Sequence, residues 1–368
     1  KINFSNNFNH IKKCDFIILT EDVVVGKFGE KKISKINNYI KLILSFCKKS
    51  SIILLMSQVD IGFTKNIFNK NKNNSKSVYI INSPNTLIIG KSYMSFKSHK
   101  KIMIGIPSLD YAKDSIFKSN LLKFTKLINR KIYFTSTDTV ELAKEALMLK
   151  LAFDVSYSNF VSHFSVNHDV HYEDIIYYLK ADKRFSKHAY WKPSLGFAGG
   201  HTERSLNFFK NYSHKNEKKL INSIINYNSE RIIILRDFIS KININEKFCI
   251  IGLAYKENTL STLNSFAYQL VFNSKKNFFY YYDSSTDFEN TLKKFKKPKK
   301  IISLKASLNK CKVLIFLNKN IDSDFMISNK SLFLQFETQI IIDPLKILIS
   351  LKPFFQKNGI KYINIIEK

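Results

Sequence analysis

Apolar residues gather in short runs through the first 135 residues, and polar or helically patterned segments separate these runs. The segment 14–25 contains one such run, and Ser51–Met56, Ser77–Asn82 and Lys101–Ile106 repeat its character. Runs of this length predict buried strands. After the first of them, Ile36–Phe46 carries apolar residues at helical spacing. Strands that alternate with helices predict a parallel sheet of the Rossmann type.

The pattern changes to a helical period after Thr135. Apolar residues then recur at spacings of three and four, which predicts one long amphipathic helix. These residues are Leu142, Ala146, Leu149, Phe153, Tyr157, Phe160 and Phe164. Asp138, with Glu141 three residues later, has the spacing of a capping box at the start of this helix. Two further helices are predicted over Tyr172–Leu179 and from Ser205 to about residue 241.

Strand patterns return in the last third of the chain. Buried strands are predicted over Lys247–Ala254, Asn277–Tyr282, Val313–Leu317 and Gln339–Ile342, with a helix over Ser265–Val271. This arrangement predicts a second unit that contains both a sheet and helices.

Together these patterns predict the α/β fold class, with two Rossmann-like parallel-sheet domains joined by a helical middle region that has one long central helix. The predicted domains are residues 1–135, 136–241 and 242–368. A GxGxxG turn, whose backbone amides cradle the phosphates of a dinucleotide, does not occur in the sequence.

The composition excludes several classes of protein. A share of 45% apolar and 24% charged residues among 368 is typical of a globular chain. No stretch reaches the roughly 20 apolar residues of a membrane helix, so no membrane partner is predicted. The four cysteines lie far apart without a CxxC pair, which argues against a disulfide framework or a metal site. This cysteine usage favours the reducing cytoplasm.

The net charge of +30 raises the possibility of an anionic partner. The excess is mostly lysine and is spread along the chain, without arginine and aromatic residues interleaved as in nucleic-acid motifs. Nucleic acid is therefore not the predicted partner, although a basic scaffold that binds nucleic acid or an acidic protein stays an alternative.

Glycine is scarce in this chain and is concentrated in one place. Of only ten glycines, three (Gly196, Gly199 and Gly200) fall within five residues. Glycine is favoured where the backbone needs a positive φ or lies close against a ligand. The cluster therefore predicts a shaped loop and a candidate ligand site, with an ordinary flexible connection as the alternative.

Three segments in this order resemble the UDP-glucose/GDP-mannose 6-dehydrogenase family, which includes the UDP-N-acetylmannosamine members. Val140-Glu-Leu-Ala-Lys144 resembles the AELxKxxxN motif at the head of that family's long helix, and Gly196-Phe-Ala-Gly-Gly-His201 its glycine loop. Gly252-Leu-Ala-Tyr-Lys-Glu-Asn-Thr259 is similar to its GLAFKPNT motif. Weaker similarities are Ser57–Gly62 to STVxxG and Ile342-Asp-Pro344 to a closing IDxR strand.

The resemblance implies an NAD-binding domain over 1–135, a dimer-forming helical domain over 136–241 and a nucleotide-sugar-binding domain over 242–368. It implies NAD as cofactor, a UDP- or GDP-sugar as partner and a homodimer. It also implies that the first residue of this chain falls inside the first domain, so that the glycine turn for NAD would precede it. Members of the family oxidise a sugar C6 alcohol to a carboxylate through a cysteine thioester, since a thiolate is a strong nucleophile.

Most of the family's catalytic positions are changed in this chain. Its cysteine falls on Thr202 and its aspartate on Leu206. The glutamate of the family's xPExxxxG segment falls on Asn85, the threonine of STVxxG on Gln58, and the asparagine of the long helix on Met148. A threonine hydroxyl does not ionise unaided, and leucine cannot transfer a proton.

Lys144 is the catalytic position that the comparison leaves in place. The resemblance implies substrate binding by Gly196, Phe197, Gly199, Gly200 and Lys256, and a cofactor contact by Ser57. The function predicted from these residues is that of a family member whose activity is lost or severely reduced. An active dehydrogenase with rearranged catalytic residues, or one that performs a single oxidation, is the alternative.

Overall fold

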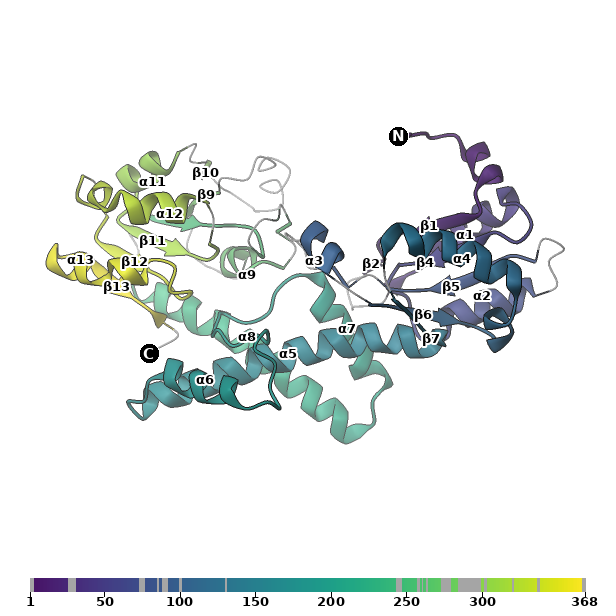
Figure 1. Cartoon of the computed structure of the whole chain (residues 1–368). Coiled ribbons are helices and arrows are strands. Elements are labelled where there is room, and N and C mark those ends of the chain that lie inside the picture. The colour runs from purple at the N-terminus through teal and green to yellow at the C-terminus, as the bar shows by residue number, and fades with distance from the viewer. Residues whose placement is uncertain are drawn as a thin grey trace. The chain divides into compact units, whose positions relative to one another are not determined.

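A computed structural model describes most of the chain. The described residues are 3–25, 31–72, 77–84, 86–87, 92–98, 101–129, 131–242, 247–256, 259, 261–262, 264–272, 279–283, 299–300, 303–319, 321–335 and 338–365. The chain divides into two compact units, Lys1–Met148 and Leu149–Lys368, and Figure 1 shows one main sheet in each. The domain boundaries at 135/136 and 241/242 stay predictions.

The first unit is built on a five-stranded sheet in the order β1-β4-β5-β6-β7. Its strands are β1 (Phe16–Leu19), β4 (Ile52–Leu55), β5 (Tyr79–Asn82), β6 (Lys101–Ile106) and β7 (Lys131–Ser136). Neighbours are parallel except β5 and β6, which meet in antiparallel sense where Asn82 faces Gly105. A separate two-stranded ribbon joins β2 (Val24–Val25) to β3 (Lys31–Lys32).

Helices cover both faces of this sheet, as its buried strands require. They are α1 (Ser34–Phe46), α2 (Phe63–Asn71), α3 (Ser92–Ser98) and α4 (Ser115–Ile128), with 3-10 turns at Phe8–Lys13 and Leu109–Ala112. Successive residues of β4 point to opposite faces. Ile53 and Leu55 accordingly belong to the apolar cluster under α1, and Ile52 and Leu54 belong to the cluster with Phe117 of α4.

Four helices follow: α5 (Thr137–Asn167), α6 (Tyr172–Ala181), α7 (Gly200–Tyr212) and α8 (Lys215–Ser240). The long predicted helix is confirmed as α5, whose 31 residues cross the boundary between the units. The single helix predicted from Ser205 to about 241 was wrong. The segment forms two helices instead, because the backbone at Ser213 and His214 is in an extended conformation that interrupts the helix.

The predicted capping box at the start of α5 was also wrong. The helix begins at Thr137, directly after β7, and the Ser136 hydroxyl accepts a hydrogen bond from the amide of Thr139 at 3.1 Å. Ser136 therefore caps the helix, as serine commonly does. Glu141, which the box would have used, bonds instead to distant segments of the first unit. Glu141 thus makes hydrogen bonds to residues far away in the sequence in place of the predicted capping bond.

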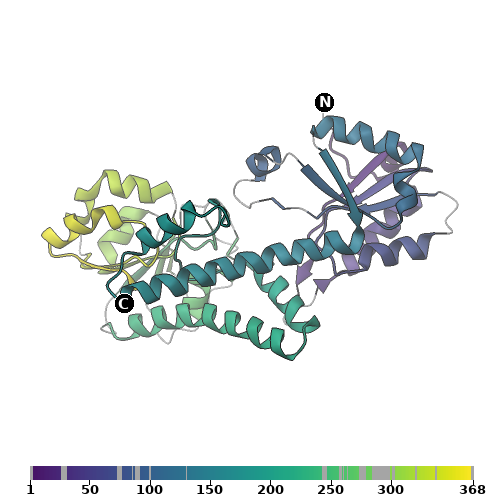
Figure 2. The same ribbon diagram turned by 60° about the horizontal axis from the view of Figure 1, so that its bottom comes forward.

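The last part of the predicted apolar stripe of α5 lies on the surface of the chain, whereas Leu149 and Phe153 pack against a buried cluster. Tyr157, Phe160 and Phe164 are all exposed, and the rings of Phe160 and Phe164 stack with centroids 6.4 Å apart. Small and polar side chains, such as Ala152 and Asn159, occupy the buried face instead. Figures 1 and 2 show the second half of α5 beside α8, where Ala152 packs in one cluster with Ile224.

The second unit contains a six-stranded sheet in the order β10-β9-β8-β11-β12-β13, in which every neighbouring pair is parallel. Its strands are β8 (Phe248–Ile251), β9 (Phe279–Tyr282), β10 (Lys299–Lys300), β11 (Val313–Phe316), β12 (Ile340–Ile342) and β13 (Lys361–Ile363). Its helices are α9 (Phe266–Phe272), α11 (Leu304–Lys310), α12 (Ile321–Ser328) and α13 (Lys352–Lys357), with 3-10 turns at Lys330–Leu334 and Ile349–Leu351.

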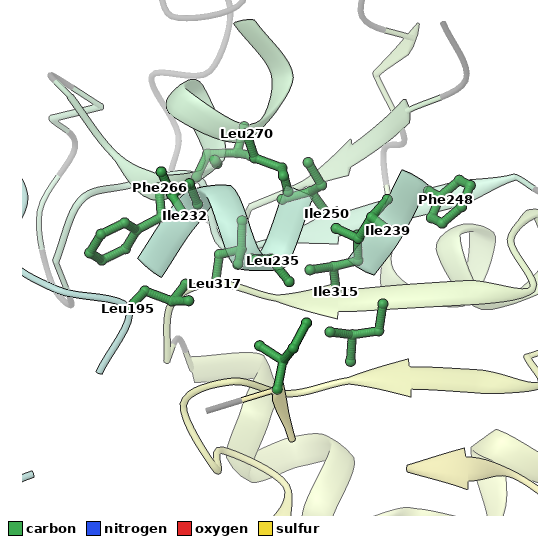
Figure 3. Packing of buried hydrophobic residues seen from close by; sticks show 14 of the residues in the cluster. Leu195, Ile232, Leu235, Ile239, Phe248, Ile250, Phe266, Leu270, Ile315 and Leu317 are labelled. Atoms are coloured by element: carbon green, nitrogen blue, oxygen red, sulfur yellow. The ribbon is translucent and has the colours of Figure 1, made fainter. Parts of the chain in front are cut away.

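Both faces of this second sheet are buried. Phe248 and Ile250 face a core that α8 and α9 complete, whereas Cys249 and Ile251 face the other core. Figure 3 shows the first core, in which Leu195 from the segment before α7 reaches Leu317 and Ile232. The two parallel-dominated sheets with their helices confirm the predicted α/β fold class. Within the described residues, no helix has the length and apolar character to cross a membrane.

Candidate functional site

The glycine loop is fixed in place by its neighbours in the second unit. Leu195 is buried in the core, and Gly196 has a φ of 125°, which favours glycine. Asn228 of α8 clamps the next residue: its Oδ1 accepts from the amide of Phe197 at 2.7 Å, and its Nδ2 donates to the Phe197 carbonyl at 3.0 Å. A Cβ at Gly196 would lie 2.2 Å from Asn228 Oδ1. The loop is therefore a shaped segment rather than a flexible connection.

Helix α7 begins inside the glycine cluster. Gly199 is its N-cap with φ 88°, and Gly200, His201 and Thr202 form the first turn, which no side chain caps. The first amides of a helix have no partner within the helix and favour negative charge. A cysteine in this turn would have its thiolate stabilised, as the family's chemistry requires. Thr202, a half-buried residue, has a hydroxyl at this position instead.

Leu206 lies one turn further along α7 and is fully buried. It packs in an apolar cluster with Ala152 of α5 and with Ile221 and Ile224 of α8. A carboxylate at this position would be desolvated without a compensating charge, which is strongly unfavourable. Leu206 therefore fills the core among apolar side chains.

His201 and Arg204 form a polar pair at the start of α7. Arg204 is buried, and its Nη2 lies 2.7 Å from Nδ1 of His201. A guanidinium has only donors, so Nδ1 is the acceptor and the proton of the neutral ring sits on Nε2. The pair thus fixes His201 as a donor through Nε2 and leaves neither ring nitrogen ready to take a proton.

The second glycine motif, which begins at Gly252, contacts the glycine loop within the second unit. Gly252 follows β8 with φ 86°, and the amides of Leu253 and Ala254 donate to Oδ2 of Asp283, at 2.7 and 3.3 Å. Tyr255 then lies against Gly199, where an added Cβ would come within 2.9 Å of its ring. Lys256 follows Tyr255 and is half-buried. The loop and the lysine that the resemblance singled out are thus brought close together.

Replacement of Gly252 by alanine is expected to lower the free energy of unfolding by about 2–4 kcal/mol, from positive φ plus overpacking. Its Cβ would lie 2.7–2.8 Å from Cβ, N and O of Asn318. Gly359→Ala is the control, because Gly359 has φ 72° and nothing within 4 Å. Denaturant unfolding of both variants separates the two costs. Equal losses would contradict the close approach of Asn318.

In the first unit, Glu141 ties the start of α5 to the sheet. Its carboxylate accepts from the amide of Gly62 at 2.7 Å, from the amide and hydroxyl of Thr64 at 3.1 and 2.6 Å, and from Nδ2 of Asn82 at 3.1 Å. Burial raises the pKa of Glu141 above its ordinary value, although these donors oppose the shift. Glu141 is thus a structural residue of the motif that contains Lys144.

Glu145, one turn later, is fully buried beside Lys31 and Gln58. Its Oε1 accepts from the Lys31 ammonium at 2.7 Å and from Nε2 of Gln58 at 2.9 Å. The Lys31 side chain is only 2% exposed, and its ammonium also lies 3.0 Å from the carbonyl oxygen of Val59 and 3.0 Å from Oδ1 of Asp60. This group of Lys31, Gln58, Asp60 and Glu145, called the Lys31 cluster below, joins β3, α5 and the segment after β4.

The carboxyl end of β4 is where a Rossmann sheet would receive a dinucleotide. Here Gln58 is buried and bonded to Glu145, and the buried Ser57 donates to the carbonyl of Glu21. These side chains are directed to the chain itself and do not fit NAD. Lys144 and Met148 on α5 are half-buried. Asn85 lies outside the described residues.

Asp343, which matches the family's closing strand, is also structural. It is fully buried after β12 and accepts from the amides of Ile347 and Leu348, at 2.9 and 2.6 Å, and from the hydroxyl of Tyr362 at 2.9 Å. Burial raises the pKa of Asp343 above its ordinary value. In the described part of the chain, no three His, Cys, Asp or Glu side chains gather as metal ligands.

Sequence reasoning missed Asn228, Arg204 and Glu145. Asn228 carried one usable signal, because it interrupts the apolar positions Ile221, Ile224 and Leu235 at helical spacing. A polar residue on a buried stripe needs a partner. No sequence pattern indicated Arg204 or Glu145. Arg204 contacts His201 on the preceding turn of its helix, and Glu145 bonds to Lys31, which is 114 residues away in the chain.

The fold has counterparts among solved structures. No protein-family model matches the sequence, and neither does any curated protein. A UDP-glucose dehydrogenase from the hyperthermophilic archaeon Pyrobaculum islandicum matches with 15% identity and a TM-score of 0.78, over 99% of this chain and 82% of that chain. A UDP-N-acetyl-mannosamine dehydrogenase from Staphylococcus aureus matches with 18% identity and a TM-score of 0.70, over 96% and 82%. The chain has the fold of nucleotide-sugar dehydrogenases.

A third similar structure is a dehydrogenase of another nucleotide sugar. An NDP-N-acetyl-D-galactosaminuronic acid dehydrogenase from Methanosarcina mazei Go1 matches with 12% identity and a TM-score of 0.67, over 98% of this chain and 79% of that chain. At such identities the dehydrogenase fold is shared, while the residues that perform the chemistry are free to differ. The function therefore has to be argued from the residues themselves.

Proposed function

We propose that the chain is a cytoplasmic member of the nucleotide-sugar 6-dehydrogenase family that binds a UDP- or GDP-sugar and does not complete the family's oxidation. This proposal rests on the residues in the first two turns of α7. Its uncapped first turn presents Thr202, and Leu206 one turn later is sealed in the core. The loop for the substrate is retained, and the groups for the reaction are not.

Binding is assigned to the glycine loop and the motif that meets it. Asn228 holds the loop Gly196–Gly200 in its shape, and Tyr255 packs against it. Backbone amides in such turns bind phosphate or sugar oxygens. Lys256 supplies a positive charge beside them. Lys144 belongs to the first unit, and its role stays a prediction from the resemblance.

The oxidation fails at its nucleophile. A thioester route needs a group that ionises near neutral pH, and the Thr202 hydroxyl would need a neighbouring base to do so. His201 is the adjacent candidate, but the guanidinium of Arg204 faces its Nδ1 at 2.7 Å. A proton cannot be accepted there while the guanidinium occupies that position. The pair argues against the alternative of an active enzyme with rearranged residues.

NAD is part of this proposal only because the sequence resembles the dehydrogenase family. It would supply the hydride acceptor, and the described residues Ser57 and Gln58 are bonded within the chain instead. No step is therefore assigned through the cofactor. A homodimer is supported by the exposed stripe of α5 with Tyr157, Phe160 and Phe164, since apolar surface of this kind is typical of an interface.

Incubation of the protein with NAD and a panel of UDP- and GDP-sugars is expected to give no NADH absorbance above the rate without enzyme. The same sugars are expected to raise the melting temperature, because a ligand that binds only the folded state stabilises it. Turnover of any sugar would overturn the claim of lost activity. Failure of every sugar to shift the melting temperature would overturn the binding claim.

A further inference from the structure

Helix α8 directs one stripe of residues into the second unit. The stripe consists of Ile221, Ile224, Asn228, Arg231, Leu235 and Ile239. Spacings of three and four place these residues on one face of the helix. Four of the six are apolar and pack in the cores around α8. The side-chain amide of Asn228 bonds to the backbone of Phe197, which accounts for this polar residue on the inward face. The charge of Arg231 on the same face needs a separate explanation.

Arg231 is a buried cation without a carboxylate partner in the described part of the chain. The residue is 7% exposed, and its Nη2 is buried without a hydrogen-bond partner. Tyr227, one turn earlier, interacts with the guanidinium through its side chain, and burial raises the pKa of Tyr227, so its hydroxyl stays neutral and supplies no counter-charge. Burial lowers the pKa of Arg231, although an arginine stays protonated at neutral pH.

Two other arginines of the chain pair with carboxylates, whereas the buried Arg204 has His201 beside it. Arg184 pairs with Asp182 at 2.5 Å and Arg236 with Asp237 at 3.1 Å, and all four residues are at least partly exposed. A buried charge that lacks a counter-charge costs several kcal/mol. Groups held in this way concentrate at functional sites, where a ligand supplies the missing partner.

The position of Arg231 relates it to the glycine loop. Asn228, three residues earlier on the same face, holds the backbone of Phe197. Three residues along a helix correspond to about 4.5 Å. Arg231 and Asn228 therefore lie on the same face of α8, less than one helical turn apart along its axis.

We propose that Arg231 is the anion-binding residue of the glycine loop and that it receives an oxyanion of the ligand, a phosphoryl oxygen or a carboxylate. Arg231 offers a planar fork of donors that matches both groups in a bidentate manner. The identity of the whole ligand as a nucleotide sugar rests on the function proposed above. The anion site itself rests on the environment of Arg231.

The test compares Arg231→Gln with Arg236→Gln, which removes a positive charge from a partly exposed position of the same helix. Inorganic phosphate, UDP, UDP-glucose and glucuronate are titrated into each full-length protein by calorimetry. Arg231→Gln is expected to weaken binding by roughly tenfold or more, the equivalent of losing one charge-assisted hydrogen bond. Arg236→Gln is expected to bind as the unmodified chain does. Preference for phosphate and UDP over glucuronate identifies a phosphoryl oxygen, and the reverse preference a carboxylate.

Thermal unfolding without ligand provides a second readout. Arg231→Gln is expected to melt at or above the temperature of the unmodified chain, because it removes an uncompensated buried charge. A lower melting temperature together with unchanged binding would overturn the proposal and make Arg231 a structural residue. Arg231→Lys keeps the charge without the fork. Its binding is expected to be weakened, so this variant retains the test should Arg231→Gln fail to fold.

The outcomes separate this inference from the proposed function. UDP-glucose that binds equally to the unmodified chain and to Arg231→Gln overturns the anion site and leaves the proposed function standing. Phosphate that binds through Arg231 while no nucleotide sugar binds supports the anion site and removes the proposed function. An unmodified chain that binds none of the four probes overturns both.

Discussion

Replacement of Lys31 by methionine is expected to lower the free energy of unfolding by about 3–5 kcal/mol. The substitution removes the cation from the Lys31 cluster and leaves the fully buried Glu145 without its counter-charge. Oε2 of Glu145 already makes no hydrogen bond, so the carboxylate depends on Oε1 and its two donors, Lys31 and Gln58. Denaturant unfolding with a linear extrapolation measures the loss.

A double-mutant cycle with Glu145→Leu shows whether the loss belongs to the pair. Each single variant is expected to be destabilised, and Lys31→Met with Glu145→Leu is expected to recover part of the loss, because the double variant leaves no unpaired buried charge between them. Lys35→Met is the control, because Lys35 and Glu21 form a more exposed pair at 2.6 Å, and its unfolding midpoint is expected to stay unchanged. Strictly additive losses would contradict a coupled cluster.

The strands were predictable because their apolar runs are short and bounded. Both faces of each sheet are covered, so β4 and β8 show continuous apolar sequence rather than alternation. The same reasoning located the core of the second unit, in which Ile250 and Ile315 lie side by side on neighbouring strands. Local sequence sufficed where a residue's neighbours on its own strand decide its burial.

The face of α5 was not predictable from its period alone. The aromatic residues Phe160 and Phe164 are exposed, and the buried positions of the helix include Glu141 and Glu145. These carboxylates are buried because Thr64, Asn82 and Lys31 reach them from segments at least 59 residues away in the chain. Helical spacing shows that a helix has two faces, whereas distant partners decide which face is buried.

The candidate site was located by its glycines and not by its polar residues. Gly199 and Gly252 have positive φ and close neighbours, which explains why glycine is retained there in so glycine-poor a chain. Asn228 and Arg231 are separated from the loop by about 30 residues, and only the packing of α8 brings Asn228 to Phe197. The sequence therefore indicated the loop, and the fold identified what holds it.

Replacement of Leu206 by aspartate is expected to destabilise the chain by about 4 kcal/mol or more. The position is fully buried among Ala152, Ile221 and Ile224, so the carboxylate would lose its hydration without a partner. Leu206→Asn is the matched control, because it removes the same packing and adds a similar polar shape without the charge. Denaturant unfolding of both variants across pH separates the two effects.

The sign of the pH dependence follows from the desolvation of the new carboxyl in Leu206→Asp. Burial would raise the pKa of this carboxyl in the folded state above its pKa in the unfolded chain. The folded state then binds the proton more tightly, and stability is lost as pH rises above the unfolded value of about 4. Below about pH 4, Leu206→Asp and Leu206→Asn are expected to have similar stabilities. A deficit that is independent of pH would contradict an uncompensated buried charge.

The same substitution decides how far the loss of catalysis extends. Thr202→Cys alone is expected to fold, and its thiol in the first turn of α7 is expected to react with iodoacetamide faster than the buried Cys249 and Cys311. Thr202→Cys with Leu206→Asp is expected to produce no NADH from UDP-glucose, because the aspartate disrupts the core that positions α7. A stable double variant that turns over NAD would instead confine the loss to these two side chains. The core around Leu206, rather than the glycine loop, is therefore expected to be the barrier to regained activity.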